Sequence, residues 1–169
     1  MNKVSKIVVA TVLATAMALP VTNLLASGTH SNEHAKKMME FDDTDTEFGM
    51  YRADMKATKI IEIGMSDDMR FTPNMITVKK GDVVMFKHKN HGKIMHEFVL
   101  GTPKSLDQHA EMMKKFPTME HEEPYMAHVA PGESGSILWK FSSAGEFAFG
   151  CLVPGHYDAG MRGSVIVGS

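Results

Sequence analysis

The chain has 169 residues, of which 43% are hydrophobic, and these values suit one folded domain with accessory segments. Its 18 basic and 20 acidic side chains give a formal net charge of −2, so neither a polybasic surface for nucleic acid nor a strongly acidic tail is expected. Methionine occurs 16 times and histidine 9 times, whereas cysteine and tryptophan occur once each. Side chains that bind soft and borderline metal ions are therefore abundant.

The N-terminal residues have the pattern of a secretory signal peptide. Lys3 and Lys6 flank the start of an apolar run over residues 7–19, and small residues follow it. The run is too short to span a bilayer comfortably, and it has neither a cysteine for lipid attachment nor a twin arginine. We expect residues 1–26 to be removed, with a cut after Ala18 as the alternative, and the product to be periplasmic without a membrane anchor.

Residues 27–57 are polar and charged and have little apolar periodicity, so they predict a flexible segment. His30, His34 and Met38 are spaced by four residues, and one helical turn would place them on one face where they could bind copper. The alternative is a solvated leader whose histidine and methionine side chains bind nothing. Both interpretations remain open at this point.

From Thr58 onward the pattern changes to short β-rich runs divided by glycine, proline and asparagine. It predicts one domain over residues 58–169, an all-β Greek-key sandwich or barrel of about seven to eight strands. The expected strands are 58–63, 75–78, 83–86, 96–100, 135–141, 146–149 and 163–167.

One insertion departs from the β pattern. The sequence Ser-Leu-Asp-Gln from residue 105 resembles a capping box that opens a helix. Leu106, Ala110 and Met113 follow at helical spacing, which indicates packing on the core. We therefore expect one short helix around residues 105–116, ended by the proline that follows it.

The segment after this helix carries Met119, His121, Met126 and His128. Thioether and imidazole groups together suit Cu(I), so a secondary copper site is one interpretation of this segment. The other interpretation is that these side chains serve as ordinary packing and surface groups.

The most specific pattern is a loop near the C-terminus, where Cys151, His156 and Met161 stand at five-residue intervals. A thiolate, an imidazole and a weak axial thioether, completed by a second imidazole, form the ligand set that favours copper in an electron-transfer geometry. An exported domain with one cysteine cannot form an internal disulfide, so its thiol calls for another role. A buried, inert cysteine is the alternative to metal ligation.

The second imidazole must come from upstream, from His88, His91 or His96. His96 begins a predicted strand and, by the period of two, shares an inward face with Phe98 and Leu100. His88 and His91 stand among lysines, which predicts a solvent-exposed turn. We predict that His96 is the ligand, and the alternative is that it only caps the strand.

Residues 58–169 resemble a cupredoxin, and four stretches resemble more narrowly the exported cupredoxins associated with bacterial copper tolerance. These stretches are Met65–Pro73, Val78–Gly81, His96–Gly101 and Phe149–Met161. The resemblance implies a β-sandwich with the metal near one end. It also implies a type 1 copper, Cu(I)/Cu(II), whose ligands are His96, Cys151, His156 and Met161.

Two departures from common cupredoxins bear on function. Glu97 follows the first histidine, where many cupredoxins have a small amide or hydroxyl residue, and a carboxylate near the metal would favour the oxidised state. Lys87, Lys89, His91 and Lys93 stand near the site, where electron carriers usually have an apolar docking patch. Both departures weaken the case for a plain electron shuttle. The histidine and methionine residues of the N-terminal segment and of the insertion favour a role in copper tolerance and homeostasis with redox exchange at the copper.

A dedicated periplasmic electron carrier for a respiratory partner is the alternative function, and it would need only the type 1 site. A multicopper enzyme would need further histidine clusters and a second cupredoxin domain. The sequence has no His-x-His pair and no length for a second domain, so we expect no enzymatic activity. The expected partners are copper ions and a redox or copper-handling protein.

Overall fold

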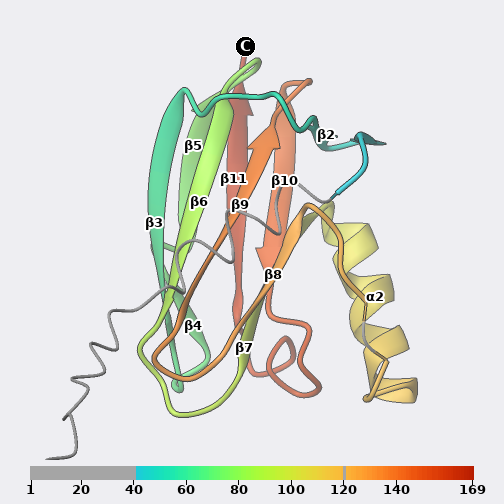
Figure 1. Ribbon diagram of the computed structural model, residues 1–169. Coiled ribbons are helices and arrows are strands. Elements are labelled where there is room, and N and C mark those ends of the chain that lie inside the picture. The colour runs from blue at the N-terminus through green and yellow to red at the C-terminus, as the bar shows by residue number, and fades with distance from the viewer. Residues whose placement is uncertain (1–40, 120) are drawn as a thin grey trace, which may run out of the picture.

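Two β-sheets lie face to face in the structure, a computed structural model that describes residues 41–119 and 121–169 (Figure 1). The first sheet has the order β1-β2-β9-β6-β3-β4, with β1 (Thr44–Thr46), β2 (Gly49–Tyr51), β3 (Lys59–Ser66), β4 (Arg70–Thr72), β6 (Val83–Asn90) and β9 (Ser134–Lys140). The second has the order β5-β11-β10-β7-β8, with β5 (Met75–Lys79), β7 (His96–Gly101), β8 (Met126–Val129), β10 (Gly145–Gly150) and β11 (Arg162–Gly168). The predicted all-β sandwich is confirmed, with more short strands than expected.

The chain passes repeatedly between the two sheets. Strand β3 pairs in parallel with β6 although β5 of the opposite sheet lies between them in sequence, and β11 pairs in parallel with β5. The other ladders are antiparallel. Such crossing connections join the sheets into one sandwich, as in Greek-key folds.

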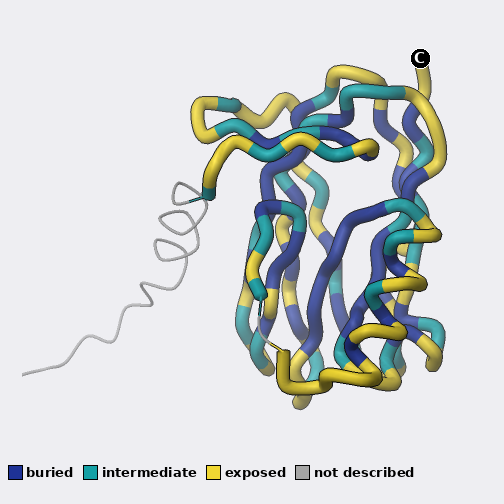
Figure 2. Tube along the Cα trace, turned by 90° about the vertical axis from the view of Figure 1, so that its right-hand side faces the viewer, coloured by how far each residue is buried: buried dark blue, intermediate teal, exposed yellow. Residues whose placement is uncertain are grey.

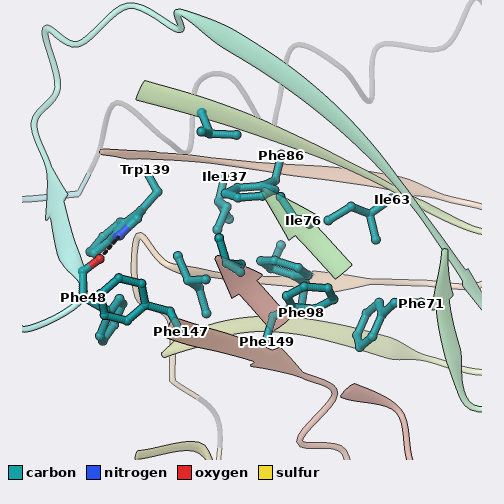
Figure 3. Packing of buried hydrophobic residues seen from close by; sticks show 14 of the residues in the cluster. Phe48, Ile63, Phe71, Ile76, Phe86, Phe98, Ile137, Trp139, Phe147 and Phe149 are labelled. Carbon is teal, nitrogen blue, oxygen red and sulfur yellow. Dashed lines mark hydrogen bonds between the residues drawn. The ribbon is translucent and has the colours of Figure 1, made fainter. Parts of the chain in front are cut away.

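Aromatic side chains fill the space between the sheets (Figure 3). Phe98 stacks on Phe149 with ring centroids 5.1 Å apart, and Phe71 meets Phe149 edge-on at 5.2 Å. Pairs of this kind contribute about 0.5–1.5 kcal/mol each beyond their buried area. Buried positions follow the strands, while exposed positions gather in loops and along the helix (Figure 2). The aromatic core thus joins the inner faces of the two sheets.

Strands β1 and β2 were not expected, because they lie in the segment predicted to be flexible. Phe48 and Tyr51 are buried, and β2 pairs with β9 through Met50 and Lys140. The indole Nε1 of Trp139 donates a hydrogen bond to the Phe48 carbonyl at 3.2 Å (Figure 3). The predicted start of the domain at residue 58 therefore leaves out residues that pack on the core.

The helix α2 (Pro103–Lys115) packs against β7 and β10. The Thr102 side chain accepts a hydrogen bond from the Ser105 N–H at 3.1 Å, and the Ser105 hydroxyl accepts one from the Thr102 N–H at 2.9 Å. The helix therefore begins before Ser105, which is its third residue rather than its cap, and the predicted opening is wrong by one turn. Leu106, Ala110 and Met113 are buried as predicted. No helix in the described ranges is long and apolar enough to cross a membrane.

Candidate metal centre

The start of β7 and the loop between β10 and β11 lie at the end of the sandwich opposite the C-terminus (Figure 1), and His96, Cys151 and His156 come together from these segments. His96 begins β7, Cys151 directly follows β10, and His156 lies in the loop between β10 and β11. One ligand atom from each residue lies within 4.8 Å of the other two. Across residues 41–119 and 121–169, no other group of three histidine, cysteine or acidic side chains meets this spacing.

Cys151 is a fully buried thiol. The Glu97 N–H donates to its Sγ at 3.3 Å, and Nδ1 of His156 lies 3.3 Å from the same Sγ. Burial raises the pKa of Cys151 to about 12, although backbone hydrogen bonds from Glu97 and Val153 oppose the rise. A metal ion bound by the thiolate must therefore displace a proton, and binding releases that proton.

The two histidines have different surroundings. Nε2 of His96 lies 3.1 Å from Oδ1 of Asp67, while its Nδ1 is buried and has no hydrogen-bond partner within residues 41–119 and 121–169. Burial, and then the neighbouring His96, lowers the pKa of His156, although Asp67 opposes this. Hydrogen bonds, first from the Lys93 N–H and then from His96, lower the pKa of Asp67. The unpartnered Nδ1 of His96 is therefore a nitrogen with a lone pair available for a metal.

Met161 is also fully buried, in the same core cluster as Cys151. The Cys151 N–H donates to the Met161 carbonyl at 3.0 Å, and the Met161 N–H donates to the His156 carbonyl at 3.0 Å. Gly160, with φ of 96°, supplies the left-handed turn that precedes Met161. These backbone hydrogen bonds bring Met161 back beside Cys151 and His156. The axial role of the Met161 thioether stays a prediction.

Helix α2 contacts the loop between β10 and β11, which carries His156. The Tyr157 hydroxyl donates to Asp107 Oδ1 at 3.0 Å, and Lys114 Nζ lies 2.9 Å from Asp158 Oδ2. These contacts join positions 50 and 44 residues apart. These contacts attach α2 to the loop between β10 and β11. No local sequence pattern indicates them.

His88 and His91, the other two upstream histidines, differ in their exposure to solvent. His88 lies inside β6, is 1% exposed, and has its ring centroid 4.3 Å from that of Phe98. Its predicted place in a solvent-exposed turn is wrong, because β6 continues to Asn90 and its alternation turns His88 inward between exposed lysines. His91 is exposed, as predicted.

Asn90, which sequence reasoning missed, holds the turn that leads to His96. Its amide Nδ2 donates to the carbonyl groups of Ile94 at 2.8 Å and Val129 at 2.9 Å. Its Oδ1 accepts from the Gly92 N–H at 2.8 Å. The buried amide thus ties the turn to β8 and fixes where His96 begins its strand.

Comparison with known proteins assigns the family. The family described as copper binding proteins, plastocyanin/azurin family, matches residues 57–168. The chain belongs to this family of cupredoxins. It is 45% identical over 150 residues to the copper-resistant cuproprotein CopI of Rubrivivax gelatinosus, covering 89% of this chain and 91% of that protein. It is 34% identical over 166 residues to the copper-resistant cuproprotein CopI of Vibrio cholerae, covering 92% and 96%.

Solved cupredoxin structures share the fold. Auracyanin from Roseiflexus castenholzii superposes with a TM-score of 0.58 at 22% identity, covering 67% of this chain and 98% of that one. The azurin Az-iso2 from Methylomonas superposes with a TM-score of 0.52 at 19% identity, covering 67% and 100%. At these identities the likeness speaks for the fold alone.

Copper is the cofactor of this cupredoxin, and the residues of the site fit it. A thiolate is a soft ligand and imidazole suits copper, and together they form the His2Cys set of electron-transfer copper sites. The donors here are the Cys151 sulfur and the imidazoles of His96 and His156. Nδ1 of His96 is buried and has no hydrogen-bond partner among the described residues, and Nδ1 of His156 lies 3.3 Å from Cys151 Sγ.

The predicted secondary copper residues occupy different surroundings. His30, His34 and Met38 lie outside the described residues. Within residues 119–128, Met119 is 36% exposed, whereas Met126 is buried in a small cluster with Leu106.

His128 is exposed, and its Nε2 lies 3.0 Å from Glu97 Oε1. His121 instead lies beside His109 of α2, with ring centroids 4.6 Å apart. Nε2 of His109 and both ring nitrogen atoms of His121 are buried and have no hydrogen-bond partner among the described residues. Sequence reasoning missed this pair.

Proposed function

We propose that this protein is a periplasmic cupredoxin with a type 1 copper site that acts in copper tolerance, with redox exchange at the bound copper. The cluster of His96, Cys151 and His156 carries the proposal, because three donors suited to copper lie within 4.8 Å of one another. The relatives named copper-resistant cuproproteins support the link to tolerance. The signal-peptide pattern of residues 1–26 supports export to the periplasm.

Bound copper supplies one-electron exchange between Cu(I) and Cu(II). Cys151 would hold the copper through its thiolate, His96 and His156 through their imidazoles, and Met161 would offer a weak thioether donor. None of these side chains serves as an acid, base or nucleophile. Because His96, Cys151 and Met161 are buried and the loop that carries His156 is held by hydrogen bonds, these side chains would keep their places in both oxidation states, which would limit reorganisation on electron exchange.

Glu97 connects this centre to the neighbouring strand β8. Its side chain is 3% exposed, its Oε2 accepts from the Leu152 N–H at 3.3 Å, and its Oε1 lies 3.0 Å from His128 Nε2. Its own N–H donates to Cys151 Sγ. A carboxylate this close to the thiolate favours the more positive, oxidised copper.

Additional copper, bound outside the type 1 site, is the second part of the proposal. The adjacent imidazoles of His109 and His121 and the exposed thioether of Met119 offer ligands that suit Cu(I). His30, His34 and Met38 are further candidates by their spacing. A tolerance protein benefits from binding more than one copper ion, whereas an electron carrier needs only the copper of the type 1 site.

Growth of a deletion strain in graded copper tests the tolerance role. We expect the deletion to lower the copper concentration that permits growth, and the wild-type gene to restore it. A gene carrying Cys151→Ser should restore it less well, because the variant lacks the thiolate ligand. Unchanged copper tolerance together with impaired respiration would contradict the proposal.

A dedicated electron carrier is the second candidate, and one surface feature favours it. Ile94 and Met95 are 41% and 42% exposed immediately before His96. Apolar side chains beside a metal ligand suit docking by a redox protein. Copper titration separates the candidates: one tight equivalent favours the carrier, whereas further Cu(I) that is lost in a His109→Gln, His121→Gln double variant favours tolerance.

A further inference from the structure

The two ring nitrogen atoms of His96 have different surroundings. Nε2 lies 3.1 Å from Asp67 Oδ1, whereas Nδ1 is buried without a hydrogen-bond partner. The tautomer of a histidine is set by the hydrogen bond that its second nitrogen makes. Because a carboxylate accepts hydrogen bonds and does not donate them, Nε2 carries the proton and Nδ1 keeps its lone pair.

Asp67 is itself held in place by the turn that precedes His96. It lies between β3 and β4, and its Oδ2 accepts from the Lys93 N–H at 2.7 Å. A Cβ atom at Gly92 would overlap the Asp67 carboxylate, so the glycine permits this close approach. The carboxylate thus joins the β3–β4 turn, the turn before His96 and the imidazole itself.

We infer that Asp67 is a positioning residue of the copper centre, which sets the tautomer and orientation of His96 and makes its imidazole a stronger donor to Cu(II). The inference rests on the proposed type 1 site. Carboxylates that orient a metal-bound histidine raise the basicity of the ring, and their loss typically costs 10–100-fold in metal affinity. Asp67 is 38% exposed, so its substitution leaves the core intact.

The first test uses metal-free protein and reads the tautomer directly. Nitrogen-15 chemical shifts of His96, measured in the wild type and in Asp67→Ala, distinguish a protonated Nε2 from a protonated Nδ1. We expect protonated Nε2 in the wild type and a rise of the Nδ1-protonated form in Asp67→Ala. Thermal unfolding of both proteins confirms that the variant is folded.

The second test measures the reduction potential of copper-loaded protein. Asp67→Asn keeps an acceptor oxygen of the same reach but removes the charge, so we expect Cu(II) to lose about tenfold in affinity relative to Cu(I). For one electron this is a rise of ~59 mV. The matched control is Asp68→Asn, which removes the same charge from an exposed neighbour whose carboxylate bonds to Ser66, and it should change the potential little.

Three results would overturn the inference: protonated Nδ1 in the metal-free wild type, an unchanged potential in Asp67→Asn, or an equal shift in Asp68→Asn. Failure of the proposed function has a separate signature, because the wild type would then show no thiolate-to-copper absorption. In that event the tautomer in metal-free protein still decides whether Asp67 orients His96.

Discussion

At the scale of single residues, the polar groups buried around the metal centre have several partners each. The Asn90 side chain makes three hydrogen bonds, and the Glu97 side chain contacts Leu152 and His128. Leaving one such group unpaired in the interior costs about 1–3 kcal/mol. These residues therefore specify where the ligands lie.

Substitution of Glu97 by glutamine tests the electrostatic part of its role. Glu97→Gln keeps the size of the side chain and removes its charge, so oxidised copper loses stabilisation and the reduction potential rises. A tenfold loss in relative Cu(II) affinity would equal ~59 mV. Voltammetry of the copper-loaded protein measures the change, with Glu146→Gln, an exposed acid on β10, as the control. A lower potential in Glu97→Gln would show that the carboxylate does not act in this way.

Sequence reasoning selected the His96, Cys151 and His156 side chains that the structure brings together, but not the residues that hold them in place. Cys151, His156 and Met161 share one loop, and His96 stands at the start of an alternating strand, so local spacing was sufficient. Asp67 lies 29 residues from His96, in a different turn. Only the folded arrangement of strands brings such groups together, and for that reason no local pattern indicates them.

At the scale of elements, α2 is both a cover for the sandwich and a support for the ligand loop. Its buried face packs against β7 and β10, and Asp107 accepts a hydrogen bond from Tyr157. The helix starts at a capping box that Thr102 and Ser105 form. The stability of this helix start therefore bears on the loop that carries His156.

Loss of the helix cap has a predictable cost. Thr102→Ala removes the side-chain oxygen that accepts from the Ser105 N–H, and we expect the free energy of unfolding to fall by about 1 kcal/mol. Thr102→Ser keeps the hydroxyl and should lose much less. Denaturant unfolding of metal-free protein measures both variants. Equal losses in the two variants would show that the methyl group, rather than the cap, provides the stability.

The sequence predicts the longer strands better than the short ones. Regular alternation marks most strands of the two sheets correctly. Strands β1 and β2 were missed because three-residue strands in an acidic segment leave too short a pattern, although Phe48 and Tyr51 are buried. Strand β6 was ended too early because lysines on its exposed face resembled a turn.

At the scale of the whole molecule, the stability of metal-free protein should depend on pH through His109. Burial, and then the nearby His121, lowers the pKa of His109 below its usual 6.5, although Glu97 opposes this. The folded state therefore favours neutral His109, and this contribution is present above about pH 6.5 and is lost as the pH falls through the lowered pKa.

Unfolding of the wild type and of His109→Gln, compared at pH 7 and pH 5, isolates this effect. We expect the wild type to lose more free energy of unfolding between the two pH values than the variant, because glutamine does not titrate. Parallel losses in the two proteins would rule out His109 as the source.

The central claim is that Cys151 and the two histidines form one type 1 copper site, and the visible spectrum of the copper-loaded protein tests it most directly. The wild type, loaded with Cu(II), should show strong thiolate-to-copper absorption. Cys151→Ser should abolish this absorption, because an alcohol does not replace the thiolate. A Cys151→Ser protein that kept the strong visible absorption would contradict the assignment.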